Sequence, residues 1–214
     1  MPFSLRHLSR KAKPTPTVPG NPHPTLTPAL FGEDPLQGAV FMDCEASGLR
    51  SHSVPVEIAV AFADGRTEAM LVRPTSDWLE HAQWDPTAEK IHKIPREDIM
   101  AAPTVEQVIA WLDRVIQPGM HVLSDNPSYE AMWCQRLYKA VGRDLPFQVL
   151  DWSSLMNGLF QAAQATQAQA SDIMERVAAD YPAPHRAAPD ALRMAMMARG
   201  ASGATMKQSR IPSA

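Results

Sequence analysis

Three apolar runs of strand length in the first half of the chain constrain its fold more than any other feature of the sequence. They cover residues 38–42, 56–62 and 67–72, and an Asp64-Gly65 turn signal separates the last two. Successive strands joined by short turns favour antiparallel pairing. The sequence therefore predicts an antiparallel meander at the start of the fold.

The hydrophobic period changes after this meander. Thr104 begins a helix with Gln107 three residues later, which is the pattern of a capping box, and an apolar stripe follows. The pattern then predicts a strand over 121–124, a helix over 127–141, a strand over 147–150 and helices in the remainder. Alternation of strands and helices after a hairpin start indicates an α/β fold, with a mixed five-stranded sheet flanked by helices.

Both ends of the chain have the composition of segments outside a folded core. Residues 1–32 carry four basic residues and no acid, and they are rich in proline. Residues 201–214 are rich in Ser, Ala and Gly. We expect a disordered basic arm over residues 1–35, one domain over 36–200 and a flexible tail over 201–214.

Charge and composition exclude several classes of protein. The formal net charge of -3 argues against a protein that coats nucleic acid electrostatically. No segment approaches the ~20 uninterrupted apolar residues of a membrane span. The two cysteines, Cys44 and Cys134, are far apart in the sequence and form no Cys-x-x-Cys motif. We therefore expect no membrane partner and a reducing, cytoplasmic location.

The first predicted strand ends in a segment that carries two carboxylates. Asp43 and Glu45 project from the same side because side chains alternate along a strand, whereas Cys44 points to the other side. Carboxylates held this close repel each other, and a divalent cation such as Mg²⁺ or Mn²⁺ relieves the repulsion. The other interpretation is that both acids face water at the end of the strand.

Another acid lies at the start of the helix predicted over 127–141. With Pro127 at the first helical position, Glu130 lies in the first turn, on the stripe that faces the sheet. It would point toward the carboxyl ends of the strands, where α/β folds place their sites. Asp125 precedes this helix and could satisfy its free amides instead of binding a ligand.

The last acid of interest is Asp190, which follows Pro189 at an expected helix start. His185 lies five residues earlier in a proline-flanked turn, where it can be held over a site without lying on the helix face. Each residue also has an ordinary interpretation, since surface histidines are common and an Asp in a first turn interacts with the helix dipole.

In this order and spacing, the motifs resemble the DEDDh family of 3'–5' exonucleases, to which ribonuclease T-like enzymes belong. Asp43-Cys-Glu-Ala-Ser-Gly-Leu49 is similar to the first family motif, and His185-Arg-Ala-Ala-Pro-Asp190 is similar to the last. The resemblance covers residues 38–198. It implies a ribonuclease H-like fold, two Mg²⁺ or Mn²⁺ ions per site, and removal of nucleotides from the 3' ends of single-stranded DNA or RNA.

The resemblance also implies roles for individual residues. The metal ligands would be Asp43, Glu45, Glu130 and Asp190, the general base His185, and the substrate contacts Leu49 and Ser47. The middle motif departs from the family pattern, because a glutamate stands at the position of the third aspartate, and Asp125 could replace or assist it. The family leaves open whether the chain forms a homodimer and whether its substrate is DNA or RNA.

The sequence is compatible with two other functions. The glutamate in the middle motif would suit a catalytically weakened protein of the same fold that binds nucleic acid 3' ends without cutting them. A zinc hydrolase is disfavoured, because an all-oxygen ligand set with one histidine suits Mg²⁺ or Mn²⁺ better than Zn²⁺.

Two sets of residues have both a substrate-binding and an ordinary interpretation. The basic segment over residues 90–96 would either contact phosphates or form a solvated helix edge. Four tryptophans would either stack on bases or lie in the core, and these are Trp78, Trp84, Trp133 and Trp152.

Overall fold

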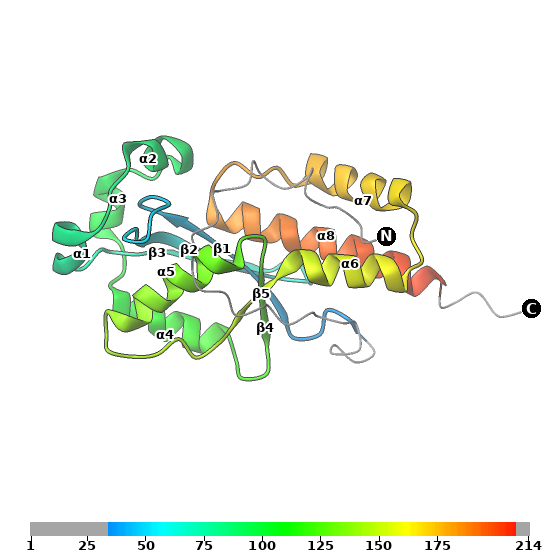
Figure 1. The fold of residues 1–214 in the computed structure, drawn as a ribbon, viewed down its shortest axis with the longest axis horizontal. Coiled ribbons are helices and arrows are strands. Elements are labelled where there is room, and N and C mark those ends of the chain that lie inside the picture. The colour runs from blue at the N-terminus through cyan, green and yellow to red at the C-terminus, as the bar shows by residue number, and fades with distance from the viewer. Residues whose placement is uncertain (1–33, 209–214) are drawn as a thin grey trace, which may run out of the picture.

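A computed structural model describes residues 34–208 of the 214-residue chain (Figure 1). Its elements are β1 (Ala39–Ala46), β2 (Pro55–Phe62), β3 (Thr67–Leu71), α1 (Ser76–His81), α2 (Pro86–His92), α3 (Arg96–Ala101), α4 (Val105–Val115), β4 (His121–Ser124), α5 (Pro127–Lys139), β5 (Val149–Asp151), α6 (Trp152–Ala162), α7 (Gln167–Asp180) and α8 (Ala187–Gln208). All but the last two residues of the predicted basic arm lie outside the described residues.

The strands form one sheet in the order β3-β2-β1-β4-β5. β1 pairs with β2 and β2 with β3 in antiparallel fashion, whereas β4 pairs in parallel with both β1 and β5. The hairpin between β2 and β3 turns at Gly65, whose φ of 92° is a conformation that residues with a Cβ rarely adopt. The predicted meander and the mixed five-stranded sheet are confirmed.

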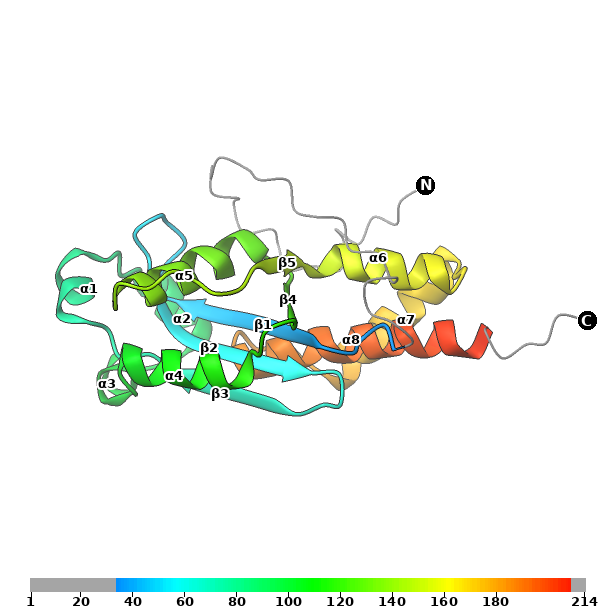
Figure 2. The same cartoon turned by 90° about the horizontal axis from the view of Figure 1, so that it is seen from below.

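Helices cover both faces of the sheet, so all eight residues of β1 are buried. Phe41 lies on the face that packs against α6, α7 and α8, whereas Val40 and Met42 lie on the face that packs against α4 and α5. Figures 1 and 2 show the sheet between these helices, with α1, α2 and α3 grouped at one end. Because side chains alternate, Asp43 and Glu45 continue the face of Phe41 and α8.

The helix signals in the sequence are largely confirmed. The Thr104 hydroxyl accepts a hydrogen bond from the Gln107 backbone N–H at 3.4 Å, and the Gln107 side chain accepts one from the Thr104 N–H at 2.9 Å. α5 begins at Pro127 as predicted, although the side chain of Asn126 makes no cap hydrogen bond. β5 begins two residues later than predicted. Phe147 precedes it and packs, partly buried, against the core on the side of the sheet covered by α4 and α5.

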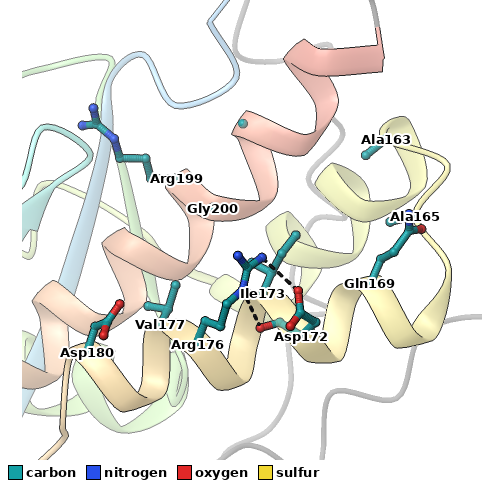
Figure 3. A pocket seen from close by; sticks show the side chains of 11 residues that line it. Ala163, Ala165, Gln169, Asp172, Ile173, Arg176, Val177, Asp180, Arg199 and Gly200 are labelled. Atoms are coloured by element: carbon teal, nitrogen blue, oxygen red, sulfur yellow. Dashed lines mark hydrogen bonds and ion pairs between the residues drawn. The ribbon is translucent and has the colours of Figure 1, made fainter.

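The folded part extends beyond the boundary predicted at residue 200. α8 continues to Gln208, and Ala201 and Ser202 are buried. A Cβ on Gly200 would come within 2.9 Å of Cγ2 of Ile173, so the small residue allows α8 to approach α7 closely (Figure 3). Small residues over 201–214 indicated a frayed tail, whereas the first two of them, Ala201 and Ser202, are buried.

Removal of residues 201–214 is expected to destabilise the protein, because it exposes the surface that Ala201 covers and removes the last turns of α8. In a domain of this size, each kcal/mol of lost stability lowers Tm by about 2–4 °C. We expect the chain ending at residue 200 to unfold at least about 4 °C below a matched chain ending at residue 208, measured by circular dichroism. Equal Tm values would show that the end of α8 contributes nothing to the fold.

Candidate active site

The central strand carries the first two acids of the site. Asp43 and Glu45 lie in the second half of β1 and are 1% and 6% exposed. In the antiparallel register with β2, Asp43 pairs with Ala59 and Glu45 with Glu57. Neither carboxylate faces water, so the interpretation that both acids are solvated at the end of the strand is wrong.

Asp190 reaches the same place from the first turn of α8. This helix begins at Ala187, three residues before the acid, and Asp190 is 4% exposed. Carboxylate oxygens of Asp43, Glu45 and Asp190 all lie within 4.8 Å of one another. We call these three residues the first triad.

α5 contributes from the other side of the sheet. Glu130 is fully buried in its first turn, and oxygens of Asp43, Asp125 and Glu130 lie within 4.8 Å of one another. We call these the second triad. Oδ1 of Asp125 is buried and accepts no hydrogen bond from the described residues, so this oxygen does not satisfy the amides of α5. Asp125 and Glu130 are therefore not exclusive alternatives, since the structure brings both to Asp43.

The two triads have the donor set of a site for two divalent cations. Their five carboxylates concentrate negative charge in a mostly buried place, which requires neutralisation. Mg²⁺ and Mn²⁺ prefer hard oxygen donors, and carboxylates supply them. Neither triad contains a cysteine or a histidine, the donors that zinc sites usually include. The residues fit two oxygen-liganded ions, with Asp43 common to both.

His185 lies in the loop between α7 and α8, two residues before the helix begins. It is exposed to solvent and adopts a φ of 63°, in the left-handed region. Residues with a Cβ occupy this region in only a few per cent of cases, although histidine does so more often than most. The histidine is thus attached directly to the helix that carries Asp190, in a conformation that its neighbours must maintain.

Glu57 is a buried carboxylate in β2 that no motif in the sequence singled out. It accepts hydrogen bonds from Nε and Nη2 of Arg186, at 3.0 and 2.6 Å, and from the backbone N–H of Ala187 at 2.9 Å. The available signal was an acid within the apolar run over residues 56–62, where an acid has no reason to be unless a partner neutralises it.

The loop after β1 carries the two predicted substrate contacts. Ser47 is buried, and its hydroxyl donates to the Gln83 carbonyl at 2.6 Å and accepts from the Val54 N–H at 2.9 Å. This hydroxyl holds the loop in place. Leu49 is 38% exposed. Substrate contact by either residue stays a prediction.

A cavity of about 210 Å³ adjoins Ser47 at the end of the molecule formed by α2 and α3. Trp84 lines it half-buried, with the Arg96 guanidinium 4.9 Å from its ring centre. His92 also lines it; Nδ1 accepts from the Ile94 N–H at 3.0 Å, and burial lowers the pKa of this histidine.

Burial shows which residues of the basic segment and which tryptophans are exposed enough to contact a substrate. His92 is buried while Lys93 is exposed, so residues 90–96 are only in part a solvated helix edge. Trp84 is the one of the four named tryptophans that is not fully buried. The other three lie in the core, as their ordinary interpretation predicted.

A second cavity, of about 600 Å³, lies between α7 and the later part of α8 (Figure 3). Asp172 and Arg176 form an ion pair across one turn of α7, and Arg199 donates to the Ala63 carbonyl at 2.7 Å. Gly200 lies ten residues beyond Asp190, which corresponds to about 15 Å along a helix. This cavity is separate from the triads.

Within residues 34–208, none of the helices combines the length and the apolar composition that a membrane span requires.

The chain is similar to known exonucleases in sequence and in structure. The profile of the exonuclease family RNase_T matches residues 40–197, and a search of curated proteins finds no match. The chain is similar to E. coli exonuclease I in a zinc-bound complex with single-stranded DNA, with a TM-score of 0.57, 15% identity, and coverage of 81% of this chain and 41% of that one. It is also similar to the nuclease domain of 3'hExo, a DEDDh family member, bound to rAMP, with a TM-score of 0.54, 16% identity, and coverage of 80% and 92%.

These structural likenesses show a ribonuclease H-like exonuclease fold, and this chain spans less than half the length of exonuclease I. The family match extends over more than half of the 214 residues and includes both triads and His185. The chain therefore belongs to the RNase_T exonuclease family, as its DEDDh-like motifs predicted.

Proposed function

We propose that this protein is a metal-dependent 3'–5' exonuclease, which hydrolyses phosphodiester bonds at the 3' ends of single-stranded DNA or RNA and releases nucleoside monophosphates. The observation that carries the proposal is the pair of carboxylate triads that share Asp43. Membership of an exonuclease family supports it. So do the ligands of the similar structures, single-stranded DNA for exonuclease I and rAMP for 3'hExo.

The triads support an assignment of the residues that would hold the ions. Asp43 would be a ligand of both, Glu45 and Asp190 would complete one ligand set, and Glu130 with Asp125 would complete the other. Two divalent cations, Mg²⁺ or Mn²⁺, supply Lewis acidity and charge neutralisation for the phosphoryl group and the leaving oxygen. The carboxylates come from the central strand, from two helices and, for Asp125, from the short connection between β4 and α5, so the core of the fold maintains their spacing.

His185 would accept the proton of the attacking water. Imidazole is the side chain suited to exchange protons near neutral pH. The exposure of His185 lets the accepted proton pass to solvent before the next cycle. Its position in the loop, two residues before the helix that carries Asp190, supports this role.

The loop after β1 and the cavity beside it would receive the terminal nucleotide. Leu49 presents an exposed apolar surface that can contact a base, and Trp84 presents an aromatic ring on which one can stack. Ser47 would act by holding the loop, since both hydrogen bonds of its hydroxyl go to backbone atoms. All of the proposed site comes from one chain, so the proposal does not require a homodimer.

The glutamate of the middle motif supports the rival function, a protein that binds 3' ends without cutting them. The longer Glu130 side chain nevertheless brings its carboxylate within 4.8 Å of Asp43, and Asp125 joins them. A complete ligand set favours hydrolysis over binding alone. A cytoplasmic location is part of the proposal, because both cysteines are free and buried.

The proposal is tested with matched 5'-labelled single- and double-stranded DNA and RNA oligonucleotides, incubated with Mg²⁺, with Mn²⁺ or with EDTA. We expect a ladder that shortens from the 3' end, release of mononucleotides, no reaction in EDTA, and no ladder from an oligonucleotide blocked at its 3' end. Preference for one sugar would identify the substrate. Binding without release would support the rival function, and internal cuts would contradict both.

A further inference from the structure

We propose that Glu57 is a positioning residue, which acts through Arg186 and the start of α8 to hold His185 in its working position. This inference rests on the proposed function, because it concerns the residue proposed as general base. Glu57 belongs to neither triad.

The contacts of Glu57 concentrate on two consecutive residues. Arg186 donates from Nε to one carboxylate oxygen at 3.0 Å and from Nη2 to the other at 2.6 Å, and the Ala187 N–H donates at 2.9 Å. A two-point contact between guanidinium and carboxylate fixes orientation as well as distance. A carboxylate at the amino end of a helix also interacts favourably with its dipole. Glu57 therefore anchors both the side chain of Arg186 and the first N–H group of α8 to the sheet.

His185 immediately precedes these anchored residues. Its φ of 63° is unfavourable for a residue with a Cβ, and such conformations persist where the surrounding contacts impose them. The chain direction on the C-terminal side of His185 is set by the three hydrogen bonds to Glu57. Loss of these bonds would allow the loop to relax and the imidazole to leave its position.

Electrostatics explain why Glu57 serves the loop and does not extend the first triad. Glu57 and Glu45 are cross-strand partners, and like charges directly opposite each other are destabilising. The hydrogen bond with Glu57 raises the pKa of Arg186, and the charges of Glu57 and Glu45 raise it further. Both oxygens of Glu57 are engaged by Arg186, so its charge is compensated without an ion.

A merely structural ion pair is the competing explanation, because a buried pair can orient a fold with no bearing on catalysis. The two explanations differ in whether the effect of Glu57 passes through His185. A double-mutant cycle between the two positions separates them.

The experiment compares Glu57→Gln in two backgrounds, the otherwise native protein and His185→Ala, in single-turnover and steady-state assays on a 3'-hydroxyl oligonucleotide. In the native background, we expect kcat to fall by about tenfold or more while KM changes by less than about twofold. In the His185→Ala background, the same substitution should change the residual rate by less than about twofold. Residual rates are measurable because other parts of an active site still accelerate the reaction.

Two variants of Arg186 and one control variant distinguish loss of catalysis from loss of folding. Arg186→Met removes the ion pair with Glu57 by changing its exposed partner, and it should reproduce the fall in kcat. Arg186→Lys should retain only part of the native kcat, because lysine cannot form the two-point contact. Asp113→Asn is the matched control: Asp113 also accepts from an arginine and a second donor, Tyr138, but in α4. It should leave kcat unchanged.

The outcomes that overturn the inference are distinct from failure of the proposed function. An active native protein whose kcat is unchanged by Glu57→Gln and by Arg186→Met would overturn the inference alone. An equal loss in both His185 backgrounds would do the same, because Glu57 would then act through the carboxylates or the whole fold. A native protein that releases no nucleotides in any metal would overturn the proposed function, and this inference with it.

Discussion

Replacement of Asp43 by asparagine is expected to abolish both nucleotide release and the stabilisation of the fold by divalent cations. Asp43 is the residue common to the two triads, so the substitution removes one charged ligand from each proposed ion site. We expect the rate to fall by at least about 10³-fold, since these ions supply most of the charge stabilisation in phosphoryl transfer.

The structural readout of this prediction does not depend on activity. An ion at about 100 times its Kd stabilises a fold by about 2.7 kcal/mol, which corresponds to about 5–10 °C in Tm for a domain of this size. The native protein should show such a rise with Mg²⁺ or Mn²⁺ and lose it in EDTA, whereas Asp43→Asn should show little. Without ions, the variant should be at least as stable as the native protein, because one source of repulsion among buried carboxylates is gone.

Asp172→Asn is the control, because this exposed carboxylate belongs to an ion pair in α7 that lies away from the triads. It should leave the metal-dependent rise in Tm and the activity intact. If Asp43→Asn keeps either the rise in Tm or the native rate, the two triads do not form the proposed site.

Replacement of His185 by alanine should separate catalysis from metal binding. Removal of a general base typically costs 10²- to 10⁴-fold in rate. His185 belongs to neither triad, so the rise in Tm with Mg²⁺ or Mn²⁺ should remain. Because the histidine is exposed, imidazole added to the solution should reach the vacated position and restore part of the rate.

The matched control is His81→Ala, an exposed histidine in α1 that contacts Asp77 and Glu80. It should retain the native rate and show no response to imidazole. Full activity of His185→Ala would rule out this residue as the base, while leaving the proposal for the carboxylates in place.

Local patterns in the sequence predicted the parts of the site that depend on local geometry. Alternation along a strand placed Asp43 and Glu45 on one side, and helix starts located Glu130 and Asp190 near the ends of their helices. These signals depend on only a few neighbouring residues, so they can be recognised in the sequence without knowledge of the whole fold. The decision between Asp125 and Glu130 depended on how α5 docks, and the structure brings both to Asp43.

Contacts between distant segments could not be predicted in the same way. Glu57 and Arg186 are 129 residues apart, and no local pattern pairs them. Cys44 and Cys134 are likewise distant in the sequence, yet their side chains meet, and this contact together with burial raises the pKa of Cys44. The end of α8 was missed for a related reason: small residues are typical of flexible tails, and only the position of α7 shows that they pack.

The distribution of the two triads along the chain has a consequence for biosynthesis. The second triad is complete once α5 has formed and docked, but the first needs Asp190, which is the last of the five carboxylates to be made. A nascent chain that still holds α8 within the ribosome therefore has at most one of the two ligand sets, and His185 is absent from its folded part. Under the proposed function, hydrolysis would require that α8 has left the ribosome and brought Asp190 to the sheet.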